Sequence, residues 1–212
     1  MSMSAAAAGP GGGFGDAPPL VCVHVLSGHQ SPLTAISYST DLDVVFSGSQ
    51  SGLLCLHTAR RGQFVRSLRL MADAPGGPTA VDLVLATSPG YLLAHSWENQ
   101  NLHLFWINGQ HRATVRTATR VEAMAVNGHS NVLVCGHSDG RISLRAVWNL
   151  QQTHLVNHSE HGAVRCLWFT DDYQFLLIGS ADGTISIGTD PDARWQLLHA
   201  AIQKTPLLGS AL

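Results

Sequence analysis

The sequence predicts an all-β protein, a β-propeller segment of about four four-stranded antiparallel blades that forms an incomplete propeller. Three observations support this fold class. Short apolar strands alternate with polar turns, one turn motif returns at a regular interval, and no stretch of twelve or more residues keeps a helical periodicity. The chain has 212 residues, 45% of them apolar, so it is long enough to bury a substantial core.

A polar turn followed by an alternating strand returns every 43–44 residues. The glycines Gly52 and Gly140 are 88 residues apart, and Gly140 and Gly183 are 43 apart. A fourth copy is therefore expected midway between the first two, and residues 94–108 (AHSWENQNLHLFWIN) supply it with Asn-Gln-Asn in place of the turn glycine. The three other copies are FSGSQSGLLCLHT (46–58), VCGHSDGRISLRA (134–146) and LIGSADGTISIGT (177–189).

Each copy is interpreted as one blade, because two strands flank the turn and a further strand lies on either side. An extra strand at 20–26 precedes the first blade and can close the ring by joining the last blade, where the strand at 194–200 competes for the same edge. The first strands are expected at 33–39, 80–87, 121–127 and 163–170, and the fourth strands at 63–70, 111–117, 152–158 and 194–200. The predicted divisions are a flexible Gly/Ala/Pro-rich leader at 1–19, blades at about 20–70, 71–117, 118–158 and 159–200, and a tail at 201–212.

The segment Gly136-His137-Ser138-Asp139-Gly140 matches G-x-S-x-G, the nucleophile elbow of serine hydrolases. That elbow requires a helix directly after the turn, whereas the residues after Gly140 alternate as in a strand. Ser138 is therefore predicted to be a turn residue. The acids Asp139 and Asp182 are expected to bond the backbone of their turns, and the glycines to adopt a positive φ. A helix beginning at Gly140 would instead support the alternative, a hydrolase.

A second enzymatic alternative is a metal site at His154, His158 and His161, which are spaced H-x3-H-x2-H. These residues lie at a strand end and in a loop, with no cysteine or carboxylate at ligand spacing. The glycine-rich GPGGG at 9–13 lacks the strand and helix of a phosphate loop. We therefore expect no catalytic residues, no cofactor and no metal.

The charge, the apolar runs and the cysteine content limit the expected partners and the expected cellular location. The net charge is −2, and eleven arginines and one lysine are spread along the chain, so nucleic acid is not an expected partner. No apolar run reaches 18 residues, which argues against direct membrane insertion. Four scattered cysteines and an N-terminus without a secretory signal favour a reducing, cytoplasmic location.

The repeats resemble WD repeats. The Gly28-His29 pair matches the Gly-His of that family, Ser47 matches its serine, and Asp139 and Asp182 match its turn acid. No blade carries the full His–Ser–Asp–Trp set, so stability is expected to depend more on apolar packing and backbone ladders than on buried polar networks. The tryptophan position is filled by His57, Phe105, Arg145 and Gly188.

Residues 22–190 more closely resemble the C-terminal WD-repeat region of BEACH-domain proteins, in the branch of neurobeachin and the lipopolysaccharide-responsive beige-like anchor. The Leu56-His57-Thr58 segment, the run at 60–66 and the INGQ at 107–110 carry this resemblance. It implies a non-catalytic scaffold in vesicle trafficking and membrane-protein sorting, cytoplasmic and peripheral on endomembranes. Propellers of that family usually close with about seven blades and this chain supplies four, so we expect a fragment; the alternatives are a closed ring of four blades and a propeller completed by another chain. The expected partners are other proteins, the rest of its own propeller or an upstream BEACH domain.

Exposed arginines and aromatic residues in the loops are the expected contact residues, since both are enriched in protein interfaces. The alternative for each tryptophan is packing between blades. The candidates are Arg60, Arg61, Trp97, Asn99, Trp106, Trp148 and His161.

Overall fold

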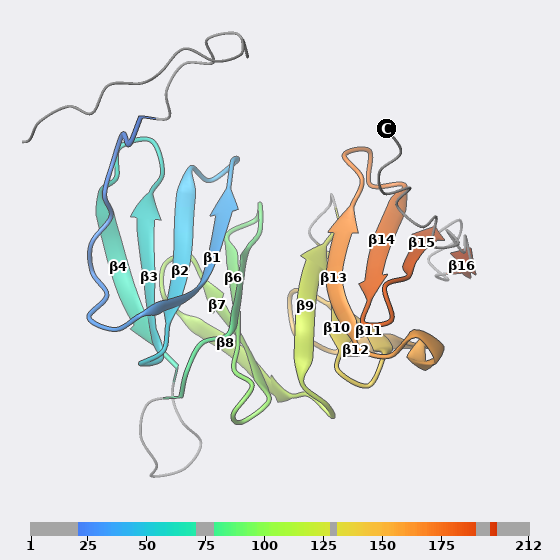
Figure 1. The fold of residues 1–212 in the computed structure, drawn as a ribbon. Coiled ribbons are helices and arrows are strands. Elements are labelled where there is room, and N and C mark those ends of the chain that lie inside the picture. The colour runs from blue at the N-terminus through green and yellow to red at the C-terminus, as the bar shows by residue number, and fades with distance from the viewer. Residues whose placement is uncertain (1–20, 71–78, 128–130, 190–195, 199–212) are drawn as a thin grey trace, which may run out of the picture.

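The computed structural model describes residues 21–70, 79–127, 131–189 and 196–198, so the predicted leader and tail lie outside the described residues. It contains four four-stranded antiparallel sheets, each built from strands consecutive in the chain (Figure 1). This arrangement confirms the predicted all-β fold of propeller blades. Within the described residues the only helix is a single 3-10 turn, η1 (Ser159–His161). No helix in this part of the chain is long and apolar enough to cross a membrane.

The strands are six residues long or close to it in most blades. Blade 1 contains β1 (Leu33–Ser39), β2 (Val44–Ser49), β3 (Leu53–Thr58) and β4 (Phe64–Arg69); blade 2 contains β5 (Leu83–Ala86), β6 (Tyr91–His95), β7 (Asn101–Trp106) and β8 (His111–Arg116); blade 3 contains β9 (Val121–Val126), β10 (Val132–His137), β11 (Arg141–Ala146) and β12 (Gln152–Asn157); blade 4 contains β13 (Val164–Phe169), β14 (Phe175–Ser180), β15 (Ile185–Thr189) and β16 (Gln196–Leu198).

The repeated turn joins the second and third strands of each blade. Gly52, Gly140 and Gly183 adopt φ values of 74°, 81° and 86° there. Side chains other than glycine rarely occupy this region, which explains why glycine recurs at the repeat interval. Blade 2 uses Gln100 at φ 57° instead.

The turn at Ser138 excludes the hydrolase alternative. The strand β11 begins at Arg141, directly after the turn, and pairs with β10 over its length. Asp139 accepts a hydrogen bond from the backbone N–H of Arg141 at 3.1 Å, which stabilises the turn. With no helix after Gly140, a nucleophile elbow does not form here.

Apolar clusters between neighbouring blades form the core. One cluster joins blades 1 and 2 around Phe46 and Leu54, a second joins blades 2 and 3 around Leu104 and Leu133, and a third joins blades 3 and 4 around Ile178. Blades 1, 2 and 3 thus each bury a sheet face against the next blade. Among the described residues no such cluster joins blade 4 to blade 1, and the ring is open (Figure 1).

Two glycines allow close contact between blades. A methyl group added at Gly48 would overlap Val81 of blade 2, and one added at Gly136 would overlap Val164 of blade 4. Blade 2 has His95 at the corresponding place, at the end of β6, and its side chain is fully buried. Blade 2 therefore has a buried imidazole at the position where blades 1 and 3 have a glycine that admits a valine.

The predicted strand at 20–26 is not formed over its described residues, 21–26. The edge of β15 that it would join is paired with β16, the competing strand. The segment lies against blade 1 through side chains instead. His24 donates a hydrogen bond from Nε2 to the carbonyl of Arg60 at 3.0 Å, and His57 donates from Nε2 to the carbonyl of Ser27 at 2.8 Å.

Two histidine–serine pairs lie within blades 1 and 3. Nε2 of His29 lies 2.9 Å from Oγ of Ser47, so one WD-type pair is retained. A different pair, His137 and Ser143, lies 2.8 Å apart between the second and third strands of blade 3. These two pairs stand beside three apolar clusters and the backbone ladders, so the expectation that stability depends more on packing and ladders than on buried polar networks stays a prediction.

Candidate interaction surface

Antiparallel pairing places the loops of every blade on two opposite faces. The first face carries the β1–β2 and β3–β4 hairpins and their equivalents, and we call it the hairpin face. The second carries the β2–β3 turn, its equivalents and the connections between blades, and we call it the crossover face. In Figure 1 the hairpin face of blades 1 and 4 is at the top and their crossover face is at the bottom.

The seven candidate contact residues divide between these two faces and do not form one site. The hairpin face carries four of them, at the ends of β3, β7 and β11: Arg60, Arg61, Trp106 and Trp148. The crossover face carries three, in the β6–β7 turn and in η1: Trp97, Asn99 and His161.

On the hairpin face, Arg60, Arg61 and Trp148 are open to solvent. The guanidinium of Arg60 lies 3.6 Å from the carboxylate of Asp43, but its side chain is 81% exposed, so this ion pair adds little stability. Trp148 is 59% exposed in the β11–β12 connection. An exposed indole of this kind is available for a partner.

Trp106 is held more firmly on the same face. Its indole stacks on the ring of Tyr91 with centroids 4.4 Å apart, and the guanidinium of Arg112 lies 5.9 Å from the ring centroid. These contacts fix the orientation of the indole and leave it half-buried.

On the crossover face, Trp97 packs at the junction of blades 2 and 3. Its Nε1–H donates a hydrogen bond to the carbonyl of Val121 at 2.6 Å, and its backbone N–H donates to the carboxylate of Asp82 at 2.7 Å. The guanidinium of Arg120 lies 3.5 Å from the ring centroid. Burial raises the pKa of Asp82, and the bond from Trp97 opposes that shift. This geometry matches the alternative of packing between blades.

His161 and Asn99 also make local contacts. Nδ1 of His161 lies 2.9 Å from the carboxylate of Asp182, linking η1 to the β14–β15 turn. Hydrogen bonds from the hydroxyl and backbone of Thr184, the larger influence, and from His161 lower the pKa of Asp182 to about 2. Asn99 accepts a bond from the backbone N–H of Asn101 at 2.9 Å, as expected for a turn.

The three histidines of the metal alternative do not gather. The rings of His158 and His161 have centroids 4.8 Å apart, but His154 lies on the exposed strand β12. Nε2 of His158 lies 3.3 Å from the hydroxyls of both Ser180 and Ser186. Across the residues that the structure describes, no group of three His, Cys, Asp or Glu side chains could hold a metal ion, so this alternative has no support.

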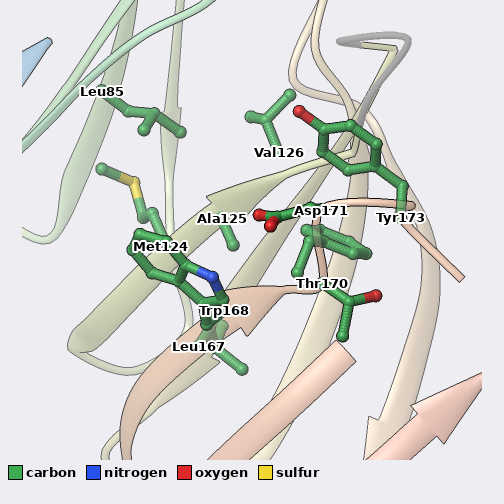
Figure 2. Close-up of a pocket in the computed structure, with 10 residues that line it drawn as sticks. Leu85, Met124, Ala125, Val126, Leu167, Trp168, Thr170, Asp171 and Tyr173 are labelled. Atoms are coloured by element: carbon green, nitrogen blue, oxygen red, sulfur yellow. The ribbon is translucent and has the colours of Figure 1, made fainter. Parts of the chain in front are cut away.

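An open pocket of about 280 Å³ lies at the hairpin end of the inner strands β5, β9 and β13 (Figure 2). Its wall is mainly apolar and includes Leu85, Met124 and Trp168. Figure 2 shows the side chains of Leu85, Met124, Trp168 and Tyr173 among those around this pocket. Blades 2, 3 and 4 all contribute to this surface.

A second, more polar pocket of about 210 Å³ shares three lining residues with the first, including Tyr173, and reaches the β1–β2 hairpin. The hydroxyl of Ser88 donates to the carboxylate of Asp41 at 2.6 Å, which joins the hairpins of blades 1 and 2 at its edge. All four blades therefore meet around one depression on the hairpin face, with apolar walls and a polar rim. Such a depression suits an inserted side chain of a partner.

The sequence interpretation missed this depression. Tyr38, Leu85 and Tyr173 are far apart in the chain and come together only because the inner strands of four blades converge. The available signal was the position of each residue at or just after the hairpin end of an inner strand. These three residues become neighbours only because the blades are arranged around one axis.

The fold and the surface define a class, a β-propeller domain that presents loops and a central depression to partners. Residues 20–189 match the family described as Neurobeachin beta propeller domain, and the chain belongs to that family.

Individual relatives agree with this assignment. BEACH domain-containing protein B of Arabidopsis thaliana is 31% identical over 164 residues, which cover 77% of this chain and 6% of that protein. A putative neurobeachin homolog of Caenorhabditis elegans is 21% identical over 183 residues, 85% of this chain and 7% of that protein. The chain thus spans less than a tenth of either relative.

Two solved structures share the fold. The computationally designed Ika4 protein superposes with a TM-score of 0.61 at 23% identity, over 78% of this chain and 95% of that one. The designed Ika8 protein gives the same TM-score and identity over 77% of this chain and 48% of that one. Four blades of this kind therefore correspond to nearly a whole chain in one case and to half a chain in the other.

Proposed function

We propose that this chain is a non-catalytic protein-interaction scaffold that acts in vesicle trafficking and membrane-protein sorting, in the cytoplasm and at the surface of endomembranes. Membership of the neurobeachin propeller family supports the scaffold role. The partners are other proteins, and on the hairpin face they would contact the central depression and the exposed Trp148.

The single observation that carries this proposal is the depression shared by all four blades. Its apolar wall contains Trp168 and Tyr173, which are 69% and 53% exposed. Exposed aromatic side chains around a concave surface are typical anchors of a protein interface. Among the described residues no group of three His, Cys, Asp or Glu side chains competes as a metal site.

The test is binding of the full chain to endomembrane vesicles in a flotation assay. We expect the chain to float with the vesicles, and to lose that binding when the vesicles are first treated with protease. Protein-free liposomes of the same lipid composition should not bind it. This pattern would show that a membrane-bound protein is the receptor.

The variant Tyr173→Asp changes the hairpin face, and Glu160→Lys serves as the matched control on the crossover face, where Glu160 is an exposed residue of η1. We expect Tyr173→Asp to reduce flotation at least several-fold and Glu160→Lys to leave it unchanged. Equal binding to protein-free liposomes, or flotation that neither protease nor Tyr173→Asp affects, would contradict the proposal.

A further inference from the structure

A positive charge is buried on the face of blade 3 that is turned towards blade 2. Arg145 pairs with Leu133 in the β10–β11 ladder, and Leu133 belongs to the apolar cluster that joins blades 2 and 3. Because directly opposite residues of an antiparallel pair share a face, the side chain of Arg145 lies on the same side as that cluster. Arg145 is only 7% exposed, and a guanidinium does not lose its proton in proteins, so the buried group is a cation.

Within the described residues no carboxylate balances the charge of Arg145, which takes part in none of their ion pairs. Its Nη1 donates a hydrogen bond to the carbonyl of Leu150 at 3.0 Å, and its Nη2 donates to Oε1 of Gln152 at 3.2 Å. Its Nε has no hydrogen-bond partner. A buried charge without a counter-ion is unfavourable, so this arrangement favours the binding of an anion.

Arg145 lines a small pocket beside the connection from blade 2 to blade 3. The pocket has a volume of about 130 Å³, and its wall also includes Thr119 of that connection, Asp139 and Arg141. A single water molecule needs about 10–15 Å³ of such space, so a carboxylate group fits. Blade 3 has a described neighbour on both sides, so the surroundings of this pocket are defined.

The charges around the pocket favour an anion with a single charge. The guanidinium of Arg141 lies 3.5 Å from the carboxylate of Asp139, and these two opposite charges cancel. His137, also in the wall, adds no charge, because burial lowers its pKa and its Nε2 already lies 2.8 Å from the hydroxyl of Ser143. The single charge of Arg145 remains and matches one carboxylate. A phosphate group, with a charge of about −1.5 to −2 at pH 7, exceeds this balance.

We propose that this pocket binds the carboxylate of an aspartate or glutamate side chain of a partner protein. Arg145 supplies the counter-charge, and Arg141, whose side chain is 52% exposed, contacts the same carboxylate from the solvent side. The planar guanidinium suits this ligand because it donates two parallel hydrogen bonds to one carboxylate. The inference rests on the proposed scaffold role and adds a contact to it, in a pocket that shares no lining residue with the central depression.

The test is an NMR titration of the full ¹⁵N-labelled chain with end-capped pentapeptides at pH 7 and constant ionic strength. Four glycines surround a central glutamate, glutamine or phosphoserine. The Nε–H signal of Arg145, assigned as the one that Arg145→Lys lacks, reports on the pocket directly. We expect the glutamate peptide to shift this signal saturably and the glutamine peptide to leave it in place. No shift with the glutamate peptide, or tighter binding of the phosphoserine peptide, would overturn the proposal.

Arg141→Gln and Arg60→Gln form a matched pair of variants for the same titration. Both arginines have exposed side chains beside an aspartate carboxylate, at 3.5 Å from Asp139 and 3.6 Å from Asp43. Arg141→Gln should weaken binding of the glutamate peptide several-fold, because it removes one cation and leaves Asp139 unbalanced, whereas Arg60→Gln should not change it. Equal effects would indicate general electrostatic attraction and overturn the pocket.

The titration and the vesicle assay can fail independently. The peptides report on the Arg145 pocket alone, whereas flotation of Tyr173→Asp reports on the central depression. Loss of peptide binding with normal flotation would overturn only the carboxylate pocket. Saturable peptide binding without flotation would overturn the proposed membrane role and leave the pocket in place.

Discussion

His95 of blade 2 and Gly136 of blade 3 occupy the same place in their blades, one filled by a buried imidazole and the other left open for Val164. His95 is fully buried, and its nearest polar partner is the hydroxyl of Thr117 at 3.4 Å. Its Nδ1 atom has no hydrogen-bond partner. Blade 2 thus adds a buried imidazole at a position where blade 3 has a glycine, beside an apolar cluster that joins blades 2 and 3.

This neutral ring predicts a loss of stability in acid. Burial, followed by the charges of His137, His103 and Arg120, lowers the pKa of His95 from the ordinary 6.5 to about 3. The unfolded chain therefore takes up the proton first, and the free energy of unfolding falls as the pH drops from about 6.5 towards 3. At pH 5 the expected loss from this group is about 2 kcal/mol.

Urea unfolding at pH 7.5 and pH 5 measures that loss, and His95→Gln is the matched variant. Glutamine keeps an amide near Thr117 but does not titrate, so the variant should lose about 2 kcal/mol less than the wild type between the two pH values. Equal losses for both proteins would show that His95 does not control the acid sensitivity. His137 has a pKa lowered in the same direction by burial, so part of the dependence should remain in the variant.

A further prediction concerns Gly136, at the junction between blades 3 and 4, where an added methyl group should destabilise the fold. Gly136→Ala would place a methyl group against Val164, and overpacking of this kind costs about 1–3 kcal/mol of unfolding free energy. Gly179→Ala is the matched control, because the methyl group there meets only the exposed Cys166 side chain, which can rotate away. Urea unfolding should show a clear cost for the first and a small change for the second. A similar cost for both would mean that strand geometry, and not the blade junction, requires glycine.

The blades could be predicted from the sequence because each depends on local information. Alternation in strands such as β15 and the glycine at Gly183 specify a hairpin within a few residues of chain. The unformed strand at 20–26 depended instead on a competition for the edge of β15 between two segments at opposite ends of the chain. The local sequence pattern of each segment does not show which of the two pairs with β15.

The sequence predicted only part of the interaction surface, because the rest depends on strand direction and on how the blades are arranged. Choosing arginines and aromatic residues identified exposed groups such as Arg60 and Trp148, but that criterion ignores strand direction. Antiparallel order places Trp97 and His161 on the opposite face. The depression around Tyr173 requires the arrangement of four blades, which no single repeat encodes.

The pair His29 and Ser47 should contribute measurably to blade 1. Nε2 of His29 lies 2.9 Å from the buried Oγ of Ser47, and a hydrogen bond of this kind contributes about 1 kcal/mol. A double-mutant cycle with His29→Ala and Ser47→Ala should give a coupling energy near that value in urea unfolding. The single variant His24→Ala removes an exposed contact and should change stability by less than about 0.5 kcal/mol. Additive effects of the two substitutions would show that the pair does not interact.

Trp97 and Trp148 should respond in opposite ways to the same substitution. Trp97→Phe removes the Nε1–H bond to Val121 and weakens the stacking of Arg120, so we expect a loss of about 1–3 kcal/mol in unfolding free energy. Trp148→Phe removes no described contact from a ring that is 59% exposed, and its effect on stability should stay within about 0.5 kcal/mol. Flotation with endomembrane vesicles should show the reverse order, with binding weakened by Trp148→Phe and retained by folded Trp97→Phe. Stability and binding that fall together in both variants would mean that Trp148 supports the fold instead of contacting a partner.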